Sequence, residues 1–159
     1  MKQGFTLIEL MIVVAIVAFL SAVAIPQCFK YQARAKQAEA AVFLASLHTA
    51  ESSYYAQHGE YTSNLAGEQG LGWKPEGYLS GGKQERFYYT YGFNNSDSSE
   101  GINYFTGKCG ASKNDLGQTS ADRFGFTIRA AADLLGNGKL DIWQIDQNRN
   151  IVHIQNGLD

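Results

Sequence analysis

One apolar segment near the N-terminus constrains the fold of this chain more than any other feature. From Phe5 to Ile25 the sequence reads FTLIELMIVVAIVAFLSAVAI, and Glu9 is its only charged residue. At about 1.5 Å per residue, a helix of this length is about 32 Å long, close to the ~30 Å hydrocarbon thickness of a bilayer. The segment therefore predicts a helix that spans a membrane.

A secretory signal peptide does not fit this N-terminus. Such a signal has a basic first region, an apolar core of about 7–15 residues, and a cleavage site of small residues after that core. Here the apolar run is longer, and the small residue, Gly4, precedes the run instead of following it. This reversed order sets the segment apart from an ordinary export signal.

The helical pattern continues beyond the apolar run. From Phe29 to about His58 there is no Gly or Pro, and most residues are good helix formers. Apolar residues recur near the 3.6-residue period of one buried stripe. The stripe comprises Phe29, Ala33, Ala40, Phe43, Leu44, Leu47, Ala50 and Tyr54. Polar residues fall mostly on the other faces, namely Lys30, Arg34, Lys36, Gln37, Glu39 and Glu51. We expect Pro26 to bend the helix and Gly59 to end it.

The remainder of the chain predicts a loop followed by a small sheet. Residues 59–86 contain seven glycines and Pro75, which favours a long irregular connection. Four segments with aromatic, β-branched or alternating residues then predict strands, at 87–93, 124–130, 140–145 and 151–154. The expected fold is α+β: a long N-terminal helix, with an apolar half and an amphipathic half, packed on a small antiparallel sheet.

Composition and motifs argue against several functional classes. The net charge of −2 lacks the basic excess of a dedicated nucleic-acid-binding protein. The histidines have no metal-ligand spacing, and Cys28 and Cys109 form no C-x-x-C pair. Segments 133–141 and 146–150 resemble calcium loops but lack required oxygen ligands, so we interpret both as turns. We expect no enzyme activity, no cofactor and no bound metal.

Residues 1–30 and the helix that follows resemble the type IV pilin family. The matching string is MKQG-FTLIELMIVVAIVAFLSAVAIP. A short basic leader ends at Gly4, Phe5 follows, Glu9 lies one helical turn later, and Pro26 ends the apolar run. The continuation FKYQARAKQAEAAVFLASLHTAESSYYAQHGEYT is similar to major pilins of the type IVa group, particularly those of delta-proteobacteria. The resemblance covers residues 1–62 well.

The resemblance implies how the chain is processed and assembled. A prepilin peptidase would cut between Gly4 and Phe5, and Phe5 would be N-methylated. Pilus assembly machinery would then extract subunits from the inner membrane, and Phe5, Glu9 and Pro26 would act in assembly. The implied division is a leader (1–4), a transmembrane and filament-core helix (5–28) and a head (29–159). The head comprises the amphipathic half of the helix (29–58), the loop (59–86) and the antiparallel sheet (87–159).

Orientation in the membrane depends on this resemblance. Lys2 precedes the apolar run, while Lys30, Arg34 and Lys36 follow it. The positive-inside rule alone would therefore place the head in the cytoplasm. The family instead implies a periplasmic head in the precursor and an extracellular filament afterwards, and we adopt that orientation.

Two interpretations of Glu9 follow from its surroundings. A carboxylate in an apolar helix is unfavourable in lipid, and pairing it with the Phe5 ammonium of an adjoining subunit would relieve that penalty. Alternatively, Glu9 complements the positive N-terminal end of its own helix. The motif around it favours the assembly role.

The leading functional hypothesis is a major structural subunit of a type IV pilus, a homopolymer used in motility, adhesion or DNA uptake. A pseudopilin or minor pilin of a type II secretion or competence machine would share the same N-terminus and is the alternative. A single-span membrane enzyme or receptor would need a catalytic or ligand-binding set of residues that the sequence lacks. We expect no specific nucleic-acid partner.

Overall fold

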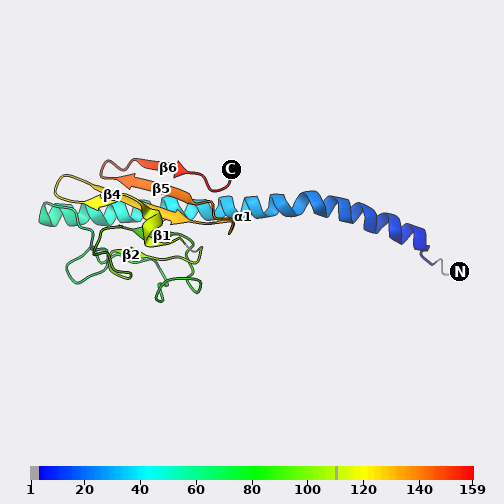
Figure 1. Ribbon diagram of the computed structural model, residues 1–159, viewed down its shortest axis with the longest axis horizontal. Coiled ribbons are helices and arrows are strands. Elements are labelled where there is room, and N and C mark those ends of the chain that lie inside the picture. Colours follow the sequence, from blue (N-terminus) through cyan, green and yellow to red (C-terminus); the bar gives the residue numbers. More distant parts are fainter. Residues whose placement is uncertain (1–3, 110) are drawn as a thin grey trace.

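One long helix and a small sheet make up the computed structural model, which describes residues 4–109 and 111–159 (Figure 1). Residues 1–3 of the expected leader lie outside the described residues. Helix α1 runs from Leu7 to His58, and Gly59 follows it in the left-handed conformation with φ of 74°. The Gly59 N–H donates to the Tyr55 carbonyl at 2.8 Å, a glycine cap that satisfies one of the last carbonyls. The predicted end of the helix is confirmed.

Pro26 lies inside α1 without breaking it. The helix remains continuous, and its protruding half curves away from the axis of the half that lies on the sheet (Figure 1). Proline removes one backbone donor and crowds the preceding turn of helix, and this accounts for the gentle curvature of the protruding half of α1.

The sheet is antiparallel and has six strands in the order β2-β1-β4-β5-β6, with β3 paired to β4. A short 3-10 helix, η1 (Lys113–Leu116), lies between β2 and β3. The strands are β1 (Thr90–Gly92), β2 (Tyr104–Phe105), β3 (Ser120–Ala121), β4 (Phe126–Ala132), β5 (Asp141–Asp146) and β6 (Ile151–Gln155). Together with α1 they confirm the predicted α+β architecture, with the helix packed across the sheet (Figure 1).

The predicted and observed strand boundaries differ most at the first predicted strand. Only Thr90–Gly92 of the predicted 87–93 forms a strand. The Tyr88 N–H instead donates to the Glu39 carboxylate at 2.7 Å, so a side chain from α1 takes the place of a strand partner. The other three predicted strands lie within two residues of β4, β5 and β6. Strands β2 and β3 have two residues each, too short for an alternating pattern to reveal them.

The core lies between the second half of α1 and one face of the sheet. Four residues of the predicted stripe are buried in it: Ala33, Ala40, Leu44 and Leu47. Facing them are buried residues of the sheet and of the segment just before β1, among them Tyr89, Tyr91, Ile128, Ala130 and Ile145. Phe29, the first residue of the predicted stripe, is 59% exposed, because the head does not cover α1 that far toward its N-terminus.

The prediction that Glu51 lies on a solvent face was wrong. Glu51 is fully buried, and Gln37 is half-buried with its amide turned toward the sheet. Both positions are in phase with the buried stripe, because Gln37 follows Ala33 by four residues and Glu51 follows Leu47 by four. Helical phase therefore decided their placement, and side-chain polarity did not.

Candidate functional site

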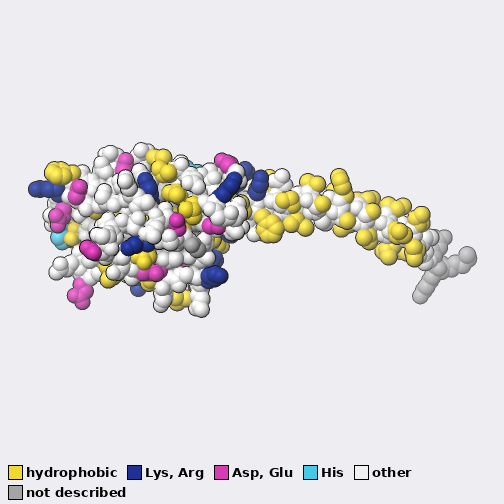
Figure 2. All heavy atoms as spheres, viewed as in Figure 1, with side chains coloured by type: hydrophobic (Ala, Val, Ile, Leu, Met, Phe, Trp, Pro, Cys, Tyr) yellow, Lys and Arg dark blue, Asp and Glu magenta, His cyan; other side chains and the backbone are white. Residues whose placement is uncertain are grey.

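The N-terminal half of α1 projects from the head as a bare apolar helix. No residue from Gly4 to Gln32 is buried, and only Ser21 is even half-buried. Figure 2 shows this half as a stalk covered with hydrophobic side chains. It is the one helix in the described ranges long and apolar enough to cross a membrane. So much apolar surface is unfavourable in water, so the helix requires lipid or other helices around it.

A capping box closes the N-terminal end of this helix. Thr6 is the N-cap, and its hydroxyl accepts from the Glu9 N–H at 3.3 Å. In return, the Thr6 N–H and hydroxyl donate to Glu9 Oε2 at 2.8 and 2.6 Å. Sequence reasoning missed Thr6, although Thr-x-x-Glu before an apolar run is the signature of this motif. In the isolated chain, Glu9 therefore does complement its own helix end.

The other residues predicted for processing and assembly are open to solvent. Phe5 precedes the N-cap and is 88% exposed. Gly4 is exposed, and a Cβ built on it would meet no atom within 4 Å. Pro26 lies 17 positions beyond Glu9, about 25 Å along the helix axis. The structure thus brings Gly4, Phe5 and Glu9 together at one tip and leaves Pro26 near the head.

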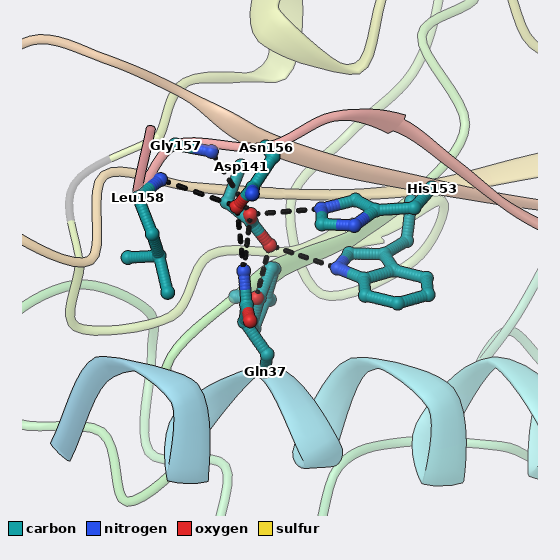
Figure 3. Close-up of polar contacts among 8 residues, drawn as sticks. Gln37, Asp141, His153, Asn156, Gly157 and Leu158 are labelled. Carbon is teal, nitrogen blue, oxygen red and sulfur yellow. Dashed lines mark hydrogen bonds and ion pairs between the residues drawn. The ribbon is translucent and has the colours of Figure 1, made fainter. Parts of the chain in front are cut away.

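A buried carboxylate at Asp141 ties α1 to the sheet and to the C-terminal segment (Figure 3). Its Oδ1 accepts from Gln37 Nε2 at 2.7 Å, and His153 Nε2 lies 2.9 Å away as an ion pair when the imidazole is protonated. The Gly157 N–H also donates to Oδ1 at 3.1 Å. Figure 3 shows Gln37 reaching up from the helix to this cluster. One oxygen atom thus connects α1, β6 and the last turn of the chain.

The second oxygen of Asp141 connects two aromatic side chains. Oδ2 accepts from the Tyr89 hydroxyl at 2.6 Å and from Trp143 Nε1 at 2.8 Å. The Trp143 ring also stacks on His153, with ring centroids 3.9 Å apart and planes 8° from parallel. Burial raises the pKa of Asp141, but these donors more than offset it, so the pKa lies below its ordinary value. Asp141 is therefore a charged structural centre with its acceptor sites satisfied.

A second carboxylate joins α1 to strand β1 and to the segment just before it. Glu39 Oε1 accepts from the Tyr88 N–H at 2.7 Å and from the Tyr91 hydroxyl at 3.1 Å. Burial raises the pKa of Glu39 above its ordinary value, although these donors act in the opposite sense. Gln37 and Glu39 together fix the rotation of α1 on the sheet.

A third buried carboxylate, Glu51, is only partly satisfied. Its Oε2 accepts from the Thr62 N–H at 3.2 Å, and its Oε1 is buried without a hydrogen-bond partner in the described residues. Burial raises the pKa of Glu51 from 4.5 to about 8. At neutral pH the group is therefore mostly protonated, which lowers the penalty of its burial.

We expect Glu51 to make the stability of the head depend on pH. Between pH 4.5 and about 8 the folded chain retains a proton that the unfolded chain has released. The free energy of unfolding should therefore fall as pH rises across this window, by on the order of 3–5 kcal/mol in total. Urea unfolding of the detergent-solubilised chain, followed by tryptophan fluorescence at several pH values, measures this slope. Glu51→Gln should flatten it and the exposed Glu60→Gln should not; equal slopes in all three proteins would contradict the assignment.

The two segments that resemble calcium loops form self-contained turns. Asp133 Oδ1 accepts from the Gly136 and Asn137 N–H groups, and its Oδ2 accepts from the Gly138 N–H. Asp146 Oδ1 accepts from two N–H groups of its own turn in the same way. These contacts agree with the interpretation of both segments as turns. Within the described residues there is no cluster of three or more potential metal ligands.

Comparison with known proteins matches the N-terminal part of the chain. A family model for the prokaryotic N-terminal methylation motif matches residues 1–25. The type IV major pilin protein PilA of Myxococcus xanthus is 51% identical over 75 residues, which are 47% of this chain and 33% of that protein. A fimbrial protein of Neisseria meningitidis is 50% identical over 64 residues, or 40% of this chain and 38% of that protein. The type IV major pilin protein PilE1 of Neisseria gonorrhoeae is 47% identical over 64 residues, or 40% and 39%. The match thus spans about a third to two fifths of the length of these relatives.

Proposed function

We propose that this chain belongs to the type IV pilin family and is a major structural subunit of a type IV pilus. It polymerises with copies of itself through the N-terminal half of α1 into a surface filament that serves motility, adhesion or DNA uptake. The observation that carries this proposal is the bare apolar helix attached to a fully folded head. A helix exposed over its whole circumference can be buried among several like helices at once, which suits the core of a polymer.

Before assembly, the same helix would anchor the precursor in the inner membrane with the head on the periplasmic side. The N-terminal methylation motif supports this order, since it implies a prepilin peptidase and the pilus assembly machinery as partners. The named relatives are structural proteins of pili or fimbriae. A structural role for this chain agrees with that family, and we propose no catalytic activity.

Processing between Gly4 and Phe5 fits the geometry of the helix tip. A side chain at Gly4 would meet nothing within 4 Å, so the space around this position does not require glycine. A requirement imposed by a peptidase accounts for a small residue at this position. We expect the mature chain to begin at Phe5 and to carry one methyl group on its amino nitrogen. Peptide mass spectrometry of sheared surface filaments checks this, and recovery of Met1 in the filaments would contradict it.

The contacts of Glu9 leave it available to a neighbouring subunit. Both Thr6 donors bind Oε2, whereas Oε1 makes no hydrogen bond in the part of the chain that the structure describes. We propose that Thr6 holds the carboxylate at the helix tip and that Oε1 receives the methylated Phe5 ammonium of an adjoining subunit. The contact of Glu9 with Thr6 and its contact with the adjoining subunit are then compatible, because they use different oxygen atoms of the carboxylate.

Abundance tests the major-subunit assignment. A host that has pilus machinery and lacks its own major pilin should regain filaments when it expresses this chain. The chain should then be the dominant protein of the sheared fraction by quantitative mass spectrometry. Filaments in which it is a trace component would instead indicate a minor pilin or pseudopilin.

A further inference from the structure

A groove lies where α1 leaves the head, between the helix and the loop that joins β4 to β5. Its volume is about 460 Å³. Pro26 and Phe29 line it on the helix side, and Leu134 and Leu135 line it on the loop side. Phe29 is 59% exposed and Leu135 is 36% exposed. Apolar surface therefore continues from the bare helix onto the head through this feature, which we call the neck groove.

The loop that forms one wall of the neck groove has a defined conformation. The Asp133 carboxylate accepts three backbone N–H groups of the loop, at 2.8 to 3.1 Å. These bonds direct the negative charge of Asp133 into the loop itself. Leu135 is thereby presented by an ordered turn, while Leu134 before it is buried in the core and anchors the loop, so no reorganisation is needed for Leu135 to meet a surface.

Positive charge borders the neck groove. Lys30 and Lys36 line it, Arg34 is exposed on the same stretch of α1, and none of the lining residues is acidic. Residues 26–38 contain these three cations and neither Asp nor Glu. Figure 2 shows Lys and Arg side chains where the hydrophobic stalk joins the head. The Lys36 ammonium also lies 5.0 Å from the centre of the Tyr88 ring, which leaves Lys30 the less engaged of the two lysines.

The neck groove would lie at the surface of a bilayer that surrounds the apolar helix. Residues 5–25 span about 32 Å and fill the hydrocarbon region, so residues 26–36 fall at the level of the headgroups. Long cationic side chains next to apolar ones suit that level, because their stems pack on apolar groups while their charges reach phosphates.

We propose that the neck groove binds the anionic headgroup of a membrane phospholipid, so that the head of the unassembled chain rests on the bilayer through loop 133–139. Lys30 and Lys36 contact the lipid phosphate, while Phe29 and Leu135 insert among the upper parts of the acyl chains. This inference rests on the proposed membrane-anchored precursor. It adds to that proposal a specific contact between the head and anionic lipid.

The test uses the full chain reconstituted into vesicles of phosphatidylcholine, alone or mixed with phosphatidylglycerol. An environment-sensitive fluorophore is attached through Leu135→Cys in a background with Cys28→Ser and Cys109→Ser. A matched probe at Phe124→Cys replaces another exposed apolar residue, which lies in the β3–β4 turn and outside the neck groove. We expect a blue shift in emission at position 135 when phosphatidylglycerol is present, and none at position 124.

Charge removal and salt should reverse this response. Each of Lys30→Gln and Lys36→Gln should reduce the ratio of docked to undocked head by about fivefold. Salt near 1 M should also weaken the response, because it shortens the screening length to about 3 Å. An emission at position 135 that is indifferent to phosphatidylglycerol or to both lysines would overturn the proposal. So would a blue shift that depends on protein density, since it would identify the helix of a second copy as the occupant.

Membrane retention separates failure of this inference from failure of the proposed function. Vesicles are first washed at alkaline pH, and the retained chain is measured. A chain that is removed by the wash contradicts the membrane-anchored precursor and with it the neck-groove proposal. A chain that is retained but gives no lipid-dependent response at position 135 contradicts the neck-groove proposal alone.

Discussion

Replacing Glu9 with Gln is expected to abolish surface filaments while leaving the chain in the membrane. The substitution removes the charge that we pair with the Phe5 ammonium of an adjoining subunit, and an ammonium buried without its partner is strongly unfavourable. Membrane insertion should be unchanged or improved, because a carboxylate is unfavourable in lipid. We expect the filament yield to fall by roughly tenfold or more, since the loss recurs at every subunit contact. The subunit, cut after Gly4, should accumulate in the inner membrane.

The capping box provides matched controls for this experiment. Gln at the third helical position still supports a capping box, so Glu9→Gln preserves the start of α1. Glu9→Ala removes both the side-chain half of the capping box and the charge. Thr6→Val removes the hydroxyl's bond to Oε2 and the bond that it accepts from the Glu9 N–H, and keeps the carboxylate. An assembly role predicts that both Glu9 variants fail and that Thr6→Val retains most filaments. If Glu9 served only its own helix, Glu9→Gln would behave as the native chain. Quantitative mass spectrometry of sheared filaments and membranes distinguishes the two patterns.

Asp141→Ala should destabilise the head by about 3–5 kcal/mol, because it leaves a set of buried donors without their acceptor. The Tyr89 hydroxyl and the Gly157 N–H both belong to buried residues, where solvent has little access to replace the carboxylate. Urea unfolding of the detergent-solubilised chain, followed by the fluorescence of Trp73 and Trp143, measures the effect. Asp122→Ala is the matched control, since the exposed Asp122 carboxylate accepts two N–H groups in a surface turn. It should change stability by less than about 1 kcal/mol.

The pH dependence gives a second readout for Asp141. The pKa of Asp141 is lowered in the folded chain. The contribution of its charge to the free energy of unfolding is therefore present above the ordinary pKa of 3.8, and it is lost as the pH falls through the folded pKa. The native chain should lose stability on acidification in that range, and Asp141→Ala should lose less. Equal acid sensitivity in the two proteins would show that the carboxylate is not a charged centre.

Local features of the sequence sufficed to predict much of the architecture. The apolar run, the glycine-free segment and Gly59 established a single helix that ends at His58, because helix formation and its caps depend on neighbouring residues. The same local reasoning predicted the processing segment and a role of Glu9 in assembly. It could also have found the Thr6 cap, since a capping box spans only four positions.

Only the tertiary structure decided which polar residues hold the head together. Gln37 and Tyr89 reach Asp141 across 104 and 52 positions of sequence, and no spacing rule connects residues that far apart. The apolar stripe predicts a solvent face for Glu51, yet its helical phase places it in the core, where burial raises its pKa to about 8. For the apolar half of α1, the sequence alone shows that the helix is hydrophobic. How far this helix protrudes beyond the head, however, depends on where the sheet ends. Local physics therefore specified the elements, and packing between distant segments specified their polar contacts.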